Sequence, residues 1–368
     1  MKIAIFWKYY DAYVRSFYER YPHAASQSYA LQLDTLLDDC FNWPSSVARR
    51  LRDAGHDVQF IIANAQPLQR AWANEHGIAF PPDWPFSLPL RQVEAGRPDV
   101  LWINSAYQYF GEYLHKLKPL TRKLFGWIAA AVPPGLDLSP FDCILTSHPN
   151  IAEGFRRQSV PAEILLPAFE PKVLDHLGSA TQDIEVSFIG GLTRDHSQRE
   201  EVLKTLCQQT PIQLWGYGFG PGPVTGARSF LRRARFALFP DRELGRRYRG
   251  QAWGLDMYRL LQRSRMTVNI HVDVAGGLAG NIRMFEATGM GTLLLNERAA
   301  NLQTMFEPES EVVTYGSTDE LAEKIQYYLA HDAERQQIAA TGQRRTRKDH
   351  TTARRSQELL SIFEGHAG

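Results

Sequence analysis

The stretch Gly280-Asn-Ile-Arg-Met-Phe-Glu-Ala-Thr-Gly-Met-Gly-Thr-Leu-Leu-Leu-Asn-Glu297 reads as a loop, a short helix and a buried strand. Asn281 stands where the helix begins, and Arg283 and Glu286 lie three positions apart on one of its faces. The first N–H groups of a helix and the positive end of its dipole favour a phosphate. An Arg holds anions through two parallel hydrogen bonds, and a Glu accepts from two ribose hydroxyls. The stretch therefore predicts an α/β unit that binds a sugar nucleotide.

The same stretch resembles the donor-site helix of GT-B glycosyltransferases, above all the branch related to the spore maturation protein CgeB. The pattern of that branch, Asn-x-Arg-x-Phe-Glu-Ala-x-Gly-x-Gly, is intact here at Asn281, Arg283, Phe285, Glu286, Ala287, Gly289 and Gly291. The chain departs from the wider group-1 families at Leu278, where those families place a second Glu. The alternative is an ordinary α/β unit in which Arg283 and Glu286 form a surface ion pair.

The resemblance implies a fold and an activity. The expected fold is α/β of the GT-B type, with two Rossmann-like domains facing across a cleft. The expected activity is transfer of a sugar from a nucleotide-sugar donor to an acceptor hydroxyl. The acceptor is left open among glycans, proteins, lipid-linked molecules and small molecules. The rival hypothesis is a non-catalytic protein that binds carbohydrate or nucleotide sugar and has a structural role in an envelope or spore.

Length and hydrophobic pattern favour two domains. A chain of 368 residues is longer than one hydrophobic core usually supports. Short apolar runs, each followed by polar or small residues, read as parallel strands. They cover residues 2–7, 57–63, 99–104, 124–129 and 143–146, and then 185–189, 213–218, 266–271, 292–296 and 311–315. We predict domains over residues 1–168 and 169–349, and the resemblance implies that a last helix over 350–368 crosses back to the first domain.

The segment between the first strand and the first predicted helix is long, covering residues 8–43. The helix is expected over 45–54, with Ser45 or Ser46 as its cap. The CgeB-like branch has the same insertion, which implies an acceptor-side role. An inverting reaction needs a general base, and several GT-B enzymes carry it directly after the first strand. Asp11 is the first candidate and Asp39 the second. The other acceptor-side residues expected here are Tyr10, Gln27, Ser28 and Gln32.

Two further segments are expected near the donor. The run over 188–199 reads as a strand, a Gly-Gly turn and a helix start, where backbone amides and arginines approach an anion. Its candidate residues are Gly190, Gly191, Arg194, His196 and Arg199, and Gly280 joins them from the stretch quoted first. A glycine turn before a solvated basic helix is the alternative. Trp253 and Tyr258 are candidates for stacking on a nucleobase, although aromatic residues at this spacing are often core. We favour a core role for His271.

Composition and charge exclude several classes of protein. A net charge of +1 argues against nucleic acid as the main partner. Arginines gather over 228–249, which fits a peripheral membrane contact, an acidic or lipid-linked acceptor, or a solvated helix face. The chain has no Asp-x-Asp, so we expect a metal-independent reaction without a cofactor. Three widely spaced cysteines, and no signal-peptide core at the N-terminus, lead us to expect a cytoplasmic location.

Overall fold

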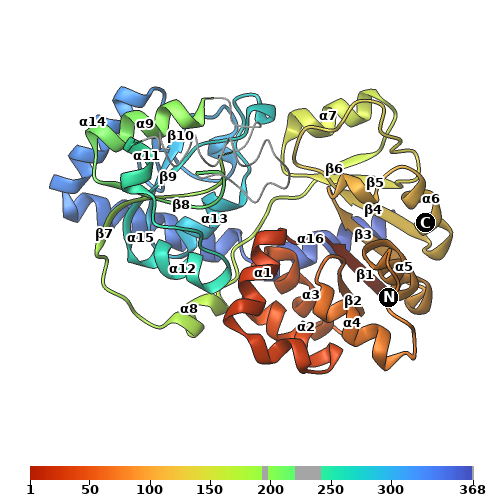
Figure 1. Ribbon diagram of the computed structural model, residues 1–368. Coiled ribbons are helices and arrows are strands. Elements are labelled where there is room, and N and C mark those ends of the chain that lie inside the picture. The colour runs from red at the N-terminus through yellow and green to blue at the C-terminus, as the bar shows by residue number, and fades with distance from the viewer. Residues whose placement is uncertain (193–197, 220–241, 367–368) are drawn as a thin grey trace. The chain divides into compact units, whose positions relative to one another are not determined.

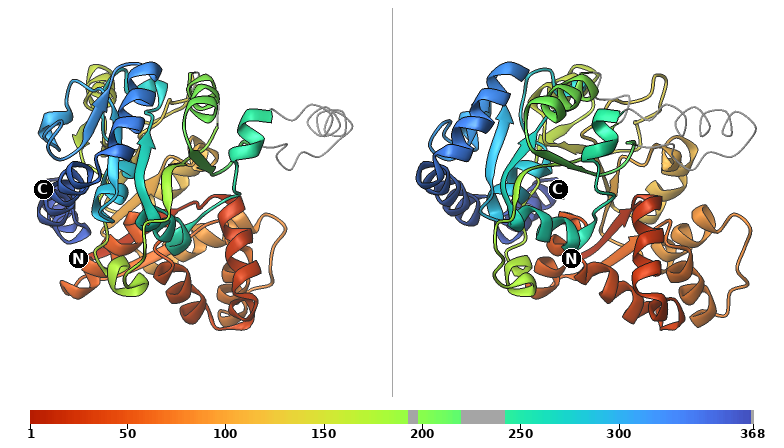
Figure 2. Two further views of the ribbon diagram at one scale, coloured as in Figure 1. Left: turned by 90° about the vertical axis from the view of Figure 1, so that its left-hand side faces the viewer. Right: turned by 60° about the vertical axis from the view of Figure 1, so that its left-hand side comes forward.

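The computed structural model describes residues 1–192, 198–219 and 242–366. The chain divides into two units. The first unit comprises Met1–Glu170 and Thr352–Gly368, and the second unit comprises Pro171–Thr351. Each unit contains one parallel sheet with helices on both faces (Figures 1 and 2). The predicted α/β class with two Rossmann-like domains is confirmed.

The sheet of the first unit has the strand order β2-β1-β3-β4-β5-β6, and every neighbouring pair is parallel. Its strands are β1 (Lys2–Trp7), β2 (Asp57–Ile62), β3 (Val100–Asn104), β4 (Lys123–Trp127), β5 (Cys143–Thr146) and β6 (Ala162–Ile164). In β1 every residue after Lys2 is buried, as expected for a parallel strand that helices cover on both sides. Five of these strands match the predicted runs, whereas β6 was not predicted because only its first residue is buried and the strand forms no apolar run.

The helices of the first unit begin with two that lie inside the segment 8–43. They are α1 (Asp11–Arg20), α2 (Tyr29–Asp38), α3 (Trp43–Asp53), α4 (Gln66–Glu75), α5 (Trp84–Gly96), α6 (Glu112–Leu117), α7 (Pro149–Arg157) and α16 (Thr352–Gly365), with 3-10 turns at Pro22–Ser26, Tyr107–Tyr109 and Lys118–Leu120. The prediction that Ser45 or Ser46 caps α3 is wrong. The cap is Asn42, whose side chain accepts from the Ser45 N–H at 3.1 Å, because Pro44 already occupies the first turn.

The last helix, α16, packs on α3 in the first unit. The buried carboxylate of Glu170 joins the two helices: Thr352 donates its hydroxyl to Glu170 at 2.7 Å, and Arg50 of α3 lies 3.0 Å from the other oxygen. Phe363 then packs against Phe125 of β4, with ring centroids 4.7 Å apart. A polar anchor at its start and an aromatic contact near its end thus fix α16 in this unit.

The second unit has the strand order β11-β10-β9-β7-β8, again all parallel. Its strands are β7 (Ile184–Ile189), β8 (Ile212–Trp215), β9 (Ser264–Asn269), β10 (Leu293–Glu297) and β11 (Val313–Tyr315). Its helices are α8 (Lys172–Leu177), α9 (Arg199–Gln209), α11 (Arg242–Arg247), α12 (Gly254–Arg263), α13 (Ile282–Gly289), α14 (Thr318–Ala330) and α15 (Asp332–Asp349), with 3-10 turns at Asp273–Ala275 and Leu302–Thr304.

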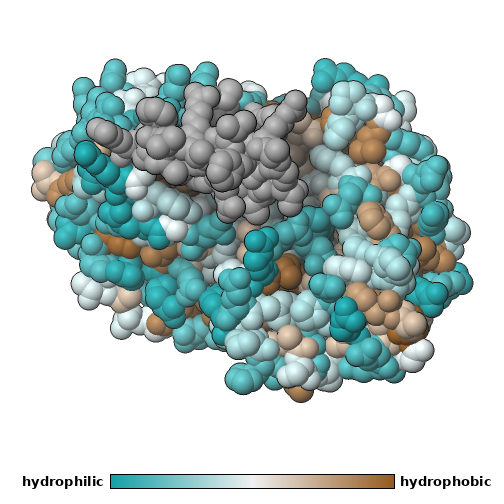
Figure 3. Space-filling model, in the orientation of Figure 1, coloured by the Kyte–Doolittle hydropathy of each residue, from teal (hydrophilic) through white to brown (hydrophobic). Residues whose placement is uncertain are grey.

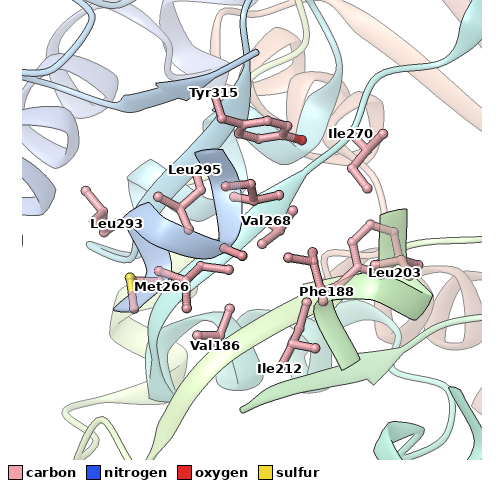
Figure 4. Packing of buried hydrophobic residues seen from close by; sticks show 14 of the residues in the cluster. Val186, Phe188, Leu203, Ile212, Met266, Val268, Ile270, Leu293, Leu295 and Tyr315 are labelled. Carbon is pink, nitrogen blue, oxygen red and sulfur yellow. The ribbon is translucent and has the colours of Figure 1, made fainter. Parts of the chain in front are cut away.

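Alternate residues of these strands build the core of the second unit. Val186 and Phe188 of β7 point to the same face as Met266 and Val268 of β9, and Leu203 of α9 packs against that face (Figure 4). The opposite face carries α12 and α13. This arrangement brings the start of α13 to the carboxyl ends of β9 and β10, where ligands bind in open parallel sheets.

The surface seen in Figure 3 is mainly hydrophilic, with apolar residues scattered in small groups. Within the described residues, no helix is both long enough and apolar enough to cross a membrane.

Candidate functional site

The start of α13 leaves its backbone N–H groups uncapped by a side chain. Asn281 occupies the cap position in an extended conformation, but its side chain makes no capping hydrogen bond. Instead its amide pairs reciprocally with the amide of Asn269, the last residue of β9, at 2.8 and 3.1 Å. The Met284 N–H donates to the Asn281 carbonyl at 3.4 Å, so the N–H groups of Ile282 and Arg283 are the ones suited to an acceptor from outside the helix, such as a phosphate oxygen.

Glu286 lies one turn further along α13 and is almost completely buried. Its Oε2 is 2.7 Å from Nη1 of Arg283, and its Oε1 accepts from the Tyr258 hydroxyl at 3.4 Å. Burial raises the pKa of Glu286, and the neighbouring Arg283 partly offsets this effect. Arg283 also donates through Nε to the carbonyl of Ile189, at 3.2 Å. Arg283 thus supports the carboxylate and the end of β7 with the same guanidinium group.

Of the two residues predicted to stack on a base, only Trp253 is partly exposed. Only 2% of the Tyr258 surface is exposed, and its hydroxyl donates a hydrogen bond to Glu286, so its ring lies in the interior. Trp253 lies nearly parallel to Tyr217, with an angle of 15° and a centroid distance of 5.9 Å. Tyr217 was not predicted, and it gives the exposed aromatic surface a second ring.

The glycines after β7 allow two loops to lie directly against each other. Gly190 donates its N–H to the carbonyl of Trp215 at 3.0 Å, and Leu192 donates to Tyr217 at 2.9 Å. A Cβ at Gly191 would lie 2.4 Å from the Tyr217 ring, and one at Gly216 would lie 1.8 Å from the Gly190 oxygen. Side chains at these positions would push the loops apart. The predicted glycine turn thus packs directly against the loop that carries Tyr217.

Arg199 does not supply free charge beside this turn, contrary to the prediction. It is buried, and its two terminal nitrogens donate to the carbonyls of Gly191 and Ile270. Burial lowers the pKa of Arg199 to about 10. Its role in this structure is to connect the loop after β7 with the end of β9. Arg194 and His196 lie outside the described residues, as does most of the arginine-rich segment 228–249.

In the first unit, two asparagines hold the backbone that follows β1. Asn104, at the end of β3, bonds both the N–H and the carbonyl of Lys8, at 3.1 and 3.2 Å. Asn64, after β2, bonds both groups of Tyr9, each at 2.9 Å. The Asn64 amide also donates to Asp11 at 2.6 Å, and Lys8 lies 3.3 Å from the other Asp11 oxygen. Asp11 is thus an exposed carboxylate with a fixed position, its side chain 70% accessible.

The second base candidate, Asp39, lies in a different environment. Its side chain is 2% exposed and is paired with Arg20 at 3.0 Å. A general base must reach the acceptor hydroxyl, and only 2% of this side chain is exposed. The structure therefore disfavours Asp39 as a base.

The four expected acceptor-side residues do not gather at one place. Tyr10 is exposed and adjoins Asp11, but Gln32 is buried and bonds Tyr18 and the Gln27 carbonyl. Gln27 and Ser28 directly precede α2. The N–H of Tyr29, the first residue of α2, donates to Glu75, the last residue of α4. Since α4 has ten residues, Glu75 is about 15 Å from the end of the helix that adjoins Asn64. Of the four, only Tyr10 stays near Asp11.

A family model matches residues mainly of the second unit, and similar solved structures cover both units. Residues 198–361 match the family model described as glycosyl transferase-like. A sucrose-phosphate synthase from Thermosynechococcus elongatus has a similar structure, with a TM-score of 0.58 and 12% identity over 99% of each chain. Anabaena HepE, solved with UDP-glucose, has a TM-score of 0.62 and 12% identity, over 99% of this chain and all of HepE. The chain has the GT-B fold. A search of curated sequences finds no significant match.

In this GT-B chain, the asparagines at the carboxyl edges of both sheets were not predicted. Asn104, Asn269 and Asn296 each stand at or near the end of an apolar strand, and Asn64 lies two positions beyond the end of another. A polar side chain at the carboxyl end of a parallel strand is the signal that points to them. Among the described residues, no group of three or more His, Cys, Asp or Glu side chains is placed to hold a metal ion.

Proposed function

We propose that this chain is a glycosyltransferase that takes its donor, a nucleotide sugar, in the second unit and its acceptor in the first. The observation that carries the proposal is the start of α13, where N–H groups without a side-chain cap lie beside the partly buried Arg283 and one turn before its buried partner Glu286. The match over 198–361 includes this helix, and similar structures were solved with UDP and UDP-glucose. The resemblance to the CgeB-like branch, the hexosyl type of donor and a cytoplasmic location belong to the same proposal.

In the proposed reaction the bond between the anomeric carbon and the diphosphate breaks as the acceptor oxygen attacks. The leaving diphosphate gains negative charge, which the dipole of α13 and the Arg283 cation would stabilise. Glu286 would accept the ribose hydroxyls, and the nearby Arg283 cation favours its charged form. In an inverting reaction Asp11 would take the acceptor proton, and its contacts with Asn64 and Lys8 would hold it in place.

Incubation with a panel of UDP-sugars tests the proposal directly. A glycosyltransferase is expected to release UDP slowly by transfer to water even without its acceptor. Binding of UDP without release from any sugar in the panel would favour the non-catalytic binding protein instead.

We expect activity to survive chelation. In the proposed mechanism a helix dipole and an arginine supply the positive charge that a divalent metal supplies in metal-dependent transferases. UDP release should therefore proceed at the parent rate, to within about twofold, after treatment with excess EDTA and removal of the chelate. Loss of activity that manganese or magnesium restores would contradict metal independence.

Trp253→Ala is expected to weaken UDP binding about tenfold. Stacking of a base on an aromatic side chain contributes about 1 to 3 kcal/mol, and Trp253 presents a partly exposed ring parallel to Tyr217. Calorimetry with UDP measures the change. Trp253→Phe is the matched control, since it keeps a flat ring and should bind nearly as the parent. Equal affinity of parent and Trp253→Ala would remove this ring from the nucleotide site.

A further inference from the structure

A network of side-chain hydrogen bonds, most of it buried, connects the start of α13 with His271, just beyond the end of β9. Asn281 pairs with Asn269, and Asn269 donates to the Asn296 oxygen at 2.7 Å. The side-chain nitrogen of Asn296, on β10, then lies 3.2 Å from Nε2 of His271. Asn269 and Asn296 are both buried, and His271 is 8% exposed. Four polar side chains thus form one connected path at the carboxyl edge of the sheet.

A single backbone carbonyl determines which atom donates and which accepts in each hydrogen bond of this network. The Asn296 amide lies 2.7 Å from the Glu297 carbonyl oxygen, which can only accept, so the atom facing it is the amide nitrogen. The Asn296 oxygen must then face Asn269, whose nearest atom must be its own donor nitrogen. The same Asn296 nitrogen faces His271, so Nε2 of that ring accepts and carries no proton. The ring is therefore neutral, with its proton on Nδ1.

The backbone around this network is fixed as well. The Tyr315 hydroxyl extends from β11 and donates to the Asn269 carbonyl at 2.7 Å, and its ring is seen near Val268 in Figure 4. The His271 N–H donates to the Glu297 carboxylate at 3.1 Å. Arg199 bonds the carbonyl of Ile270 between them. The position of His271 is consequently set by contacts from three neighbouring segments.

We propose that Asn269 and Asn296 are positioning residues of the nucleotide site. They hold the Asn281 side chain away from the first amide groups of α13, and they fix the tautomer of His271. The first effect prepares the start of α13 for an anion before the anion arrives. The effect on nucleotide affinity rests on the proposed function, whereas the proton position on His271 follows from the hydrogen bonds alone.

Two substitutions of the same type test this inference. Asn296→Asp removes the donor that faces Glu297 and His271 while keeping the size of the side chain. Asn301→Asp is the matched control: Asn301 also donates to a backbone carbonyl, that of Ala279 at 2.9 Å, but it lies outside the network that reaches His271. Nitrogen NMR of the imidazole rings shows which ring nitrogen is protonated, and the spectrum of His271→Gln assigns the signal.

The parent protein and Asn301→Asp should show the His271 proton on Nδ1, and Asn296→Asp should move it to Nε2. UDP affinity in Asn296→Asp should fall about tenfold or more. A parent ring with its proton on Nε2 would overturn the inference without any variant. So would an Asn296→Asp protein that keeps both the parent tautomer and the parent affinity. Failure of the parent to bind UDP would count against the proposed function. The tautomer spectra would still show whether the hydrogen bonds of the network have the inferred donors and acceptors.

Discussion

Glu286→Ala is expected to weaken UDP binding by about 30- to 150-fold. A hydrogen bond to a charged group contributes about 1.5 to 3 kcal/mol, and about 1.4 kcal/mol corresponds to a tenfold change in affinity. Two ribose hydroxyls would lose their shared acceptor, with part of the loss compensated by water. Calorimetry with UDP measures the effect. Unchanged affinity in a folded variant would remove Glu286 from the nucleotide site.

Folding must be separated from binding in this test. The side chain of Arg283 is 17% exposed and would lose its carboxylate partner, which destabilises a partly buried cation. Glu286→Gln keeps the shape and one acceptor oxygen, so it should fold more readily and retain part of the affinity. Glu320→Ala removes another carboxylate of the second unit, paired with Arg298 at 3.1 Å, and should bind UDP as the parent does.

Asp11→Asn is expected to lower the transfer rate by at least about 100-fold, the range typical of a missing general base. UDP affinity should not change, because the substitution leaves the second unit intact. The asparagine is similar in size and can still accept the hydrogen bond from Asn64. The measurement is UDP release, with and without an acceptor, from whichever UDP-sugar proves active.

Asp38→Asn is the matched control for this loss. Asp38 is also an exposed aspartate of the segment 8–43 and is also paired with a basic residue, Arg49. It should transfer sugar at the parent rate. If Asp11→Asn did the same, Asp11 would not be the base. Segment 8–43 would then have at most a role in shaping the acceptor site.

Strands were predictable because burial on both faces produces continuous apolar runs, as in β1. The two helices inside 8–43 were not predicted, since the faces that they bury depend on tertiary contacts such as the stacking of Tyr13 on Phe41. Asn281 was correctly expected at the start of a helix, but its partner Asn269 is twelve residues away on another element. Patterns in the sequence reveal which residues are polar, and only the fold shows which of them meet.

The same reason explains the errors in the predicted site. Arg199 reads as a free cation at the start of a helix, yet the end of β9 supplies a carbonyl that draws its guanidinium inward. Tyr258 was a candidate for stacking on a base, with a core role as the alternative, and α12 turns it toward the buried Glu286. In both cases a side chain that looks able to bind a ligand instead satisfies a group inside the protein.

Asn64 and Asn104 contact the main chain of residues 8 and 9, and main-chain atoms are the same for every amino acid. The course of the backbone after β1 therefore depends little on which side chains it carries at positions 8 and 10. A lineage could change those side chains without rebuilding the loop. We expect a randomised library at Lys8 and Tyr10 to retain folded proteins far more often than one at Asn64 and Asn104, so under the proposed function this loop is a practical place to search for changes in acceptor choice.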